Sequence, residues 1–222
     1  MKYHNIKVAA WMFLVLIASV MISSGAQTIS NSAPWNGTVY HLSGDRVQVT
    51  LPVNASRITL TLQDQAENMT LFDEHGKNIS FNSSYRYQRG DHIYSLSFAT
   101  RVQGKLIYSM SQRGQQYVLP IQGPGPVRII LPSGYTTGER SLGIARPEPD
   151  QFMDVASGTV LTWNNTTQIP YIEVNYYRRS APLAMTIIFA ILGLAGIVFL
   201  VQYYISIRKL KAARMEMENR WR

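Results

Sequence analysis

Histidine and carboxylate side chains are the residues of this sequence that could hold a metal ion. His41, His75 and His92 lie in the first half of the chain. A protein zinc site favours two or three ligands at short spacings, such as His-x-Glu-x-His or His-Glu-x-x-His, and neither spacing occurs here. A site assembled in space from His41, His92 and a carboxylate is the alternative to solvated histidines in turns. We favour solvated histidines and predict no metal ligand.

Two short polar segments are better explained as turns than as binding motifs. The segment 73–78 (DEHGKN) lacks the alternating oxygen ligands and the distal glutamate of a calcium loop. It stands between two apolar runs, so we predict a hairpin turn in which Gly76 takes a positive φ. Arg89-Gly90-Asp91 is a tripeptide that some adhesion receptors bind, and a tight turn explains it without a partner.

Motifs of nucleophilic catalysis and phosphate binding are missing from the sequence. There is no Gly-x-Ser-x-Gly elbow. Ser206 and Lys209 match Ser-x-x-Lys, but they directly follow a long apolar segment and are interpreted as the end of a helix. The prolines of 123–126 (GPGP) remove the amides that a phosphate loop requires. The chain has no cysteine, which excludes disulfides and thiolate chemistry. We predict no enzyme activity, no catalytic residue and no cofactor.

The formal charge of +8 is concentrated at the two ends of the chain. Residues 208–222 hold six basic and two acidic side chains, whereas 27–180 hold thirteen basic and eleven acidic ones, a net +2. Nucleic-acid binding requires Lys and Arg to cluster on the folded part. They are scattered there, so we predict no nucleic-acid partner.

Glycosylation acceptors are the most distinctive motif of the sequence. Ser and Thr are frequent enough that about two Asn-x-Ser/Thr motifs would arise by chance in 27–180. Seven occur, and none lies in the apolar segments or the tail; the alternative is coincidence in a Ser/Thr-rich β domain. The predicted glycosylation sites are Asn36, Asn54, Asn68, Asn78, Asn82, Asn164 and Asn165.

Two apolar segments indicate a membrane protein. A basic start, an apolar run at 8–22 and the small residues of 23–26 predict a signal peptide over 1–26, with an uncleaved signal anchor as the alternative. No charged residue occurs between Arg179 and Arg208, which predicts a transmembrane helix over 180–207. Tyrosines flank it, as expected at the headgroup zone. The heavier basic side stays in the cytoplasm, so 208–222 are predicted to be a cytoplasmic tail that continues the helix.

Between a linker at 27–37 and the span, alternating apolar residues predict a mainly β extracytoplasmic domain over 38–177. Period-two runs occur at 47–51, 58–62, 94–98, 127–131, 161–163 and 172–176. Their spacing favours an immunoglobulin-like β-sandwich, in which we expect Trp163 to be buried. The segment 123–126 either divides the domain into two subdomains or is only a rigid turn, and 147–150 mark a second long loop.

The C-terminal part of the chain resembles a known family. The run 131–135 (LPSGY) is followed by Leu142-Gly143, by 161–163 (LTW), and by 172–177 (IEVNYY) directly before the span and basic tail. Over residues 127–215 this resembles a family of uncharacterised archaeal membrane proteins, found in methanogens and halophiles, with a domain of unknown function. The resemblance implies an archaeal surface and no particular activity.

The sequence therefore predicts a single-pass, glycosylated plasma-membrane protein whose bulk lies outside the cell. We expect it to act as a structural, adhesive or ligand-binding module of the cell envelope, with the lipid bilayer as its first partner. The alternative is an accessory subunit of a membrane complex that contacts its partners through the span and the tail.

Overall fold

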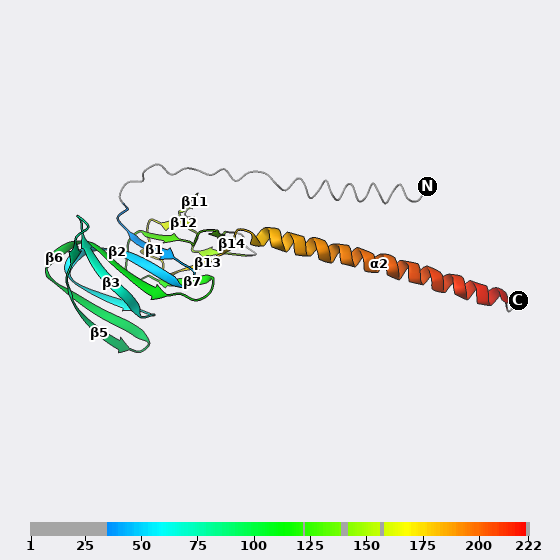
Figure 1. Ribbon diagram of the computed structural model, residues 1–222, viewed down its shortest axis with the longest axis horizontal. Helices are drawn as coiled ribbons and strands as arrows, with labels where there is room; N and C mark the ends of the chain where they lie inside the picture. The colour runs from blue at the N-terminus through cyan, green and yellow to red at the C-terminus, as the bar shows by residue number, and fades with distance from the viewer. Residues whose placement is uncertain (1–34, 122, 139–141, 156–157, 221–222) are drawn as a thin grey trace.

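The computed structural model describes residues 35–121, 123–138, 142–155 and 158–220 (Figure 1). The signal peptide predicted at 1–26 and most of the predicted linker lie outside the described residues. A β-rich body stands at one end of the long helix α2 (Ala181–Arg220), as Figure 1 shows. The strands are β1 (Thr38–Leu42), β2 (Arg46–Leu62), β3 (Ala66–Asp73), β4 (Asn78–Ile79), β5 (Asn82–Gln88), β6 (Asp91–Ser111), β7 (Gln116–Pro120), β8 (Val127–Ile130), β9 (Tyr135–Thr136), β10 (Ala145–Arg146), β11 (Gln151–Val155), β12 (Gly158–Trp163), β13 (Tyr171–Asn175) and β14 (Tyr177–Arg178).

The strands form three sheets. The largest has nine strands in the order β11-β12-β8-β1-β2-β6-β3-β4, with β5 also paired to β6. A three-stranded sheet has the order β10-β13-β7, and β14 pairs with β9. Only the β1–β8 pair is parallel among the described strands. The expectation of a mainly β domain with one C-terminal helix is confirmed, whereas the immunoglobulin-like sandwich stays a prediction.

A long, folded ribbon of β2 and β6 organises the large sheet. The alternating runs at 47–51 and 58–62 belong to one continuous strand, β2, with a register shift between Ala55 and Arg57. The Tyr94 side chain, near the start of β6, bonds through its hydroxyl to the backbone of Ala66. Ala66 is paired with Met110 at the opposite end of β6. The ribbon must therefore fold back, so that its two halves face one another.

The interior between these halves is one apolar core. Leu71, Leu96 and Leu106 are fully buried there, and Phe81 packs edge-on to Phe98 with ring centroids 6.3 Å apart. The same cluster includes Ile129 and other residues that follow 123–126. Such burial contributes about 25 cal/mol per Å² of apolar surface and is what keeps the ribbon folded.

The turns lie where the sequence predicted them. Gly76 has a φ of 78°, and the Asp73 carboxylate accepts hydrogen bonds from the amides of His75 and Lys77. Arg89 and Gly90, with φ values of 54° and 96°, make the tight turn between β5 and β6. The segment 123–126 carries the chain from β7 in the three-stranded sheet to β8 in the nine-stranded sheet. Strands on both sides of it share the large sheet and the core, and a division of the domain at this segment stays a prediction.

Trp163 is buried, as the sequence predicted, with 1% of its surface exposed. Its indole Nε1 donates a hydrogen bond to the Pro147 carbonyl at 3.0 Å. This bond ties the end of β12 to the loop at 147–150.

We expect Trp163→Ala to lower the free energy of unfolding by about 3–5 kcal/mol, because a large buried side chain leaves a cavity. Thermal or urea unfolding of the full chain in detergent measures this. Trp163→Phe should lower the free energy of unfolding by less. Phe152→Ala should have little effect, because this aromatic side chain on the adjacent strand is 47% exposed. Equal melting of Trp163→Ala and the unsubstituted protein would contradict the burial.

Candidate functional site

The helix α2 is the element of the structure with the clearest functional chemistry. Among the described residues it is the one helix long and apolar enough to cross a membrane, and its apolar window has no residue buried against the body. Side chains such as Phe199 and Leu200 are 71% and 68% exposed. Exposing so much apolar surface to water is unfavourable. The helix is consistent with anchoring in a bilayer.

The beginning of α2 follows from its first residues. Ser180 is a preferred N-cap type, and Pro182 in the first turn has no amide hydrogen to leave unpaired. The Ala184 amide donates to the Ser180 carbonyl at 3.0 Å. Nothing in 208–220 ends the helix, and it reaches Arg220. The predicted continuation beyond the apolar segment is confirmed.

The far end of the apolar segment carries an aromatic and basic pair. Arg208 donates a hydrogen bond to the Tyr204 hydroxyl at 2.8 Å, and its guanidinium lies 4.6 Å from the centre of that ring. Tyrosine and arginine favour the interface between hydrocarbon and water. Forty helical residues extend about 60 Å, roughly twice the hydrocarbon thickness. The helix is therefore longer than a bilayer crossing requires.

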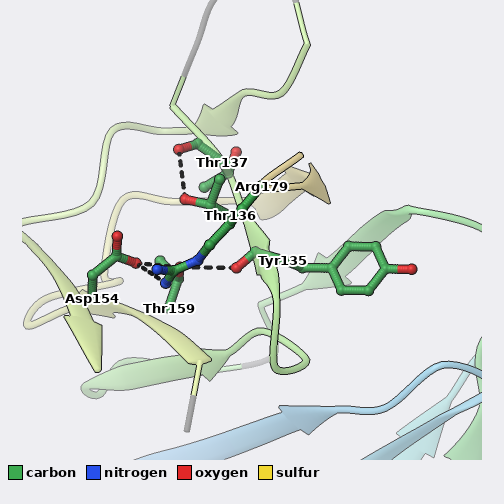
Figure 2. Close-up of polar contacts among 6 residues, drawn as sticks. All are labelled: Tyr135, Thr136, Thr137, Asp154, Thr159 and Arg179. Atoms are coloured by element: carbon green, nitrogen blue, oxygen red, sulfur yellow. Dashed lines mark hydrogen bonds and ion pairs between the residues drawn. The ribbon is translucent and has the colours of Figure 1, made fainter. Parts of the chain in front are cut away.

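A polar network joins the start of α2 to the β body (Figure 2). The Arg179 guanidinium pairs with the Asp154 carboxylate at 2.7 Å. The same carboxylate accepts a hydrogen bond from the Thr159 hydroxyl at 2.5 Å. Thr159 is fully buried and also lies 3.1 Å from the Tyr135 carbonyl oxygen. We call Arg179, Asp154 and Thr159 the juxtamembrane clamp.

Backbone bonds reinforce the clamp. The Arg179 amide donates to the Gly134 carbonyl at 2.9 Å, and Tyr177 pairs with Thr136 across β14 and β9. The Thr137 hydroxyl donates to the Asn175 carbonyl at 2.6 Å. Arg179, two residues before the helix begins, is thus held by both backbone and side-chain bonds. This arrangement can set the direction in which α2 leaves the domain.

The histidines are not brought together. His41 is exposed on β1 and His75 is exposed in its turn. His92 Nδ1 lies 3.0 Å from the Tyr85 hydroxyl, and the two rings stack 5.9 Å apart. Among the described residues, no group of three His, Asp or Glu side chains is placed to hold a metal ion. Ser206 and Lys209 lie within α2, and no Ser-Lys contact is observed between them in the described chain.

All seven predicted glycosylation asparagines are exposed. They are Asn36 before β1, Asn54 in β2, Asn68 in β3, Asn78 in β4, Asn82 at the start of β5, and Asn164 and Asn165 after β12. Two of them lie at shifts in strand register. Asn54 adjoins the register shift of β2 between Ala55 and Arg57. Asn68, with a φ of 54°, lies within the register shift of β3. Their side chains are accessible to a glycan.

Sequence reasoning missed the juxtamembrane clamp. Arg179 was interpreted only as a charge beside the span, and Asp154 was not singled out. The one available signal was a basic residue directly before an apolar helix. Its partner is 25 positions earlier, a separation that local patterns do not reveal.

The fold and the anchor define a class: a β-rich domain carried on one long apolar C-terminal helix. The chain belongs to the family of unknown function DUF5803, whose model matches residues 80–220. The match includes β5 to β14 and all of α2, and extends beyond the resemblance noted over 127–215. Among curated proteins, none matches the chain.

We expect Arg179→Gln to loosen the link between domain and helix without unfolding the domain. The pair is 44% exposed on each side, so it contributes about 1 kcal/mol or less to stability. Because the chain has no cysteine, spin labels at Phe152→Cys and Ala184→Cys can report the distance between β11 and α2. Arg179→Gln should broaden the distance distribution.

The matched control is Arg178→Gln, since the Arg178 side chain donates to the Tyr135 hydroxyl and lies over that ring. It should leave the distribution unchanged. Identical distributions for Arg179→Gln and the unsubstituted protein would show that the clamp does not orient the helix.

Proposed function

We propose that this protein is a single-pass, N-glycosylated surface protein whose β domain acts outside the cell as a non-enzymatic module of the envelope. The observation that carries the proposal is α2, an apolar helix whose surface is covered by no other part of the described chain. The basic cluster at its C-terminal end favours a cytoplasmic tail. The β domain then lies on the opposite side of the membrane.

The distribution of acceptor asparagines supports this orientation. All seven lie in the β domain and its immediate N-terminal lead, and all are exposed. N-glycosylation acceptors are used on the exported side of a membrane. Seven acceptors without any cysteine suit an archaeal surface, where packing and sugars take the place of disulfides. An immunoglobulin-like sandwich remains our proposal for the fold of this domain.

Cysteine labelling tests the topology directly. Glu74→Cys places a thiol in the exposed turn after β3, and Met217→Cys places one in the tail, where the native side chain is 62% exposed. A membrane-impermeant maleimide added to intact cells should label the first variant and not the second. Lysis should expose both, and the cysteine-free parent is the background control. Labelling of Met217→Cys in intact cells would overturn the orientation.

The overlapping acceptors at 164–167 allow a sharper prediction. The Thr166 hydroxyl, required by the Asn164 motif, is buried and donates to the Gly125 carbonyl at 2.8 Å. Thr167, required by the Asn165 motif, is exposed, and its hydroxyl donates to the Asn165 side chain at 2.6 Å. In the folded domain only the second motif presents its hydroxyl.

We therefore expect Asn165 to carry a glycan and Asn164 to be unmodified. Mass spectrometry of the protein from its native membrane should show Thr167→Ala losing one glycan. Asn164→Gln should leave the mass pattern otherwise unchanged. A glycan on Asn164 in the unsubstituted protein would contradict this reading of the loop.

A further inference from the structure

A cavity of about 320 Å³ lies between the nine-stranded sheet and β7 of the three-stranded sheet. Its walls come from β1, β2, β6, β7 and β8 and from the turns that follow β2 and β7. None of its described lining residues belongs to the juxtamembrane clamp. Small-molecule sites begin at about 300 Å³ and are mostly apolar, with a few convergent polar groups. This cavity has that character.

Three tyrosines form the inner wall. Tyr40 and Tyr108 lie in one row across the sheet, since each is paired with Val49 from opposite sides. The Tyr117 ring comes from β7 and lies 6.1 Å from that of Tyr40, tilted by 48°. Tyr108 and Tyr117 are only 4% and 6% exposed. Three aromatic rings from three strands thus converge on one space.

The tyrosine hydroxyls are polar groups at the tips of rings that line the cavity. Burial raises the pKa of Tyr40 to about 12 and also raises the pKa values of Tyr108 and Tyr117. The three hydroxyls therefore stay neutral.

The charged lining residues are both acidic. Asp64 and Asp91 line the cavity, and none of the described residues around it is Lys, Arg or His. Neither carboxylate is ion-paired within the described residues. After burial and the neighbouring tyrosines, the Asp64 carboxylate adds to the raised pKa of Tyr117, so its field reaches the inner wall. Asp64 is itself exposed and lies at the open side.

We propose that this cavity binds a small organic cation of the ammonium class. The cationic head lies among the tyrosine rings, where the ring faces attract positive charge, and Asp64 and Asp91 neutralise it from the open side. An anion would face two unpaired carboxylates, and a purely apolar ligand would leave both carboxylates without a countercharge. This proposal makes the surface protein a ligand-binding module. It relies on the proposed function only for the side of the membrane on which the ligand is found.

The test uses the full chain in detergent micelles, with choline as the probe and 3,3-dimethylbutan-1-ol as its uncharged analogue of the same shape. Calorimetric titration should show choline binding at least about tenfold more tightly than the alcohol, because only choline carries the charge. Asp64→Asn and Asp91→Asn should each weaken choline binding several-fold and leave the alcohol unaffected. Tyr40→Leu should weaken choline binding, because it removes one of the three aromatic rings.

Asp45→Asn is the matched control: it removes an exposed carboxylate that does not line the cavity and should bind choline normally. Melting of each variant checks that it is folded. Equal binding of choline and the alcohol, no choline binding up to about 10 mM, or equal binding by the Asp64→Asn and Asp45→Asn variants would each overturn the proposal. Detergent-solubilised protein has no sidedness, so this failure is separate from a failure of the topology labelling.

Discussion

The folding-back of the β2–β6 ribbon is the constraint on which the rest of the β body depends. A two-stranded ribbon cannot bury an apolar face alone. Bending near Ala55 and Arg57 lets its two halves cover one another, and the Tyr94 hydroxyl on Ala66 fixes the result. Every other strand of the large sheet is then added at an edge of this ribbon: β1, β8, β12 and β11 along β2, and β3, β4 and β5 along β6. The three-stranded sheet closes the remaining side of the core.

This construction explains why a cavity exists at all. The C-terminal half of β2 has turned away from β1, which pairs only with residues 47–50. The strand β7 belongs to the other sheet and pairs with β13. Residues 60–64 and 117–121 therefore face one another without forming a common sheet, and both line the cavity.

The sequence predicted local features well and long-range ones poorly. Period-two alternation located the strands, and Gly76 and Gly90 located two turns, because each signal is contained within a few residues. It did not predict β2 as one strand of 17 residues, since Pro52 and the polar run after it interrupt the pattern. Pro52 is tolerated because β1 ends its pairing at Thr50, so the missing amide faces no partner strand. The clamp and the tyrosine wall depend on register between distant strands, which a single sequence does not contain.

The clamp and the helix require different environments, and they meet at the start of α2. α2 needs a hydrocarbon environment along its apolar length, whereas Arg179 and Asp154 need water or one another. Arg179 directly precedes Ser180, so the ion pair with Asp154 lies at the start of the helix. Both side chains are half-exposed there, so their charges stay solvated and the pair incurs little desolvation cost. The buried Thr159 connects the pair to β12, the strand that also carries Trp163. The helix start is therefore bonded to a strand whose six residues are all buried.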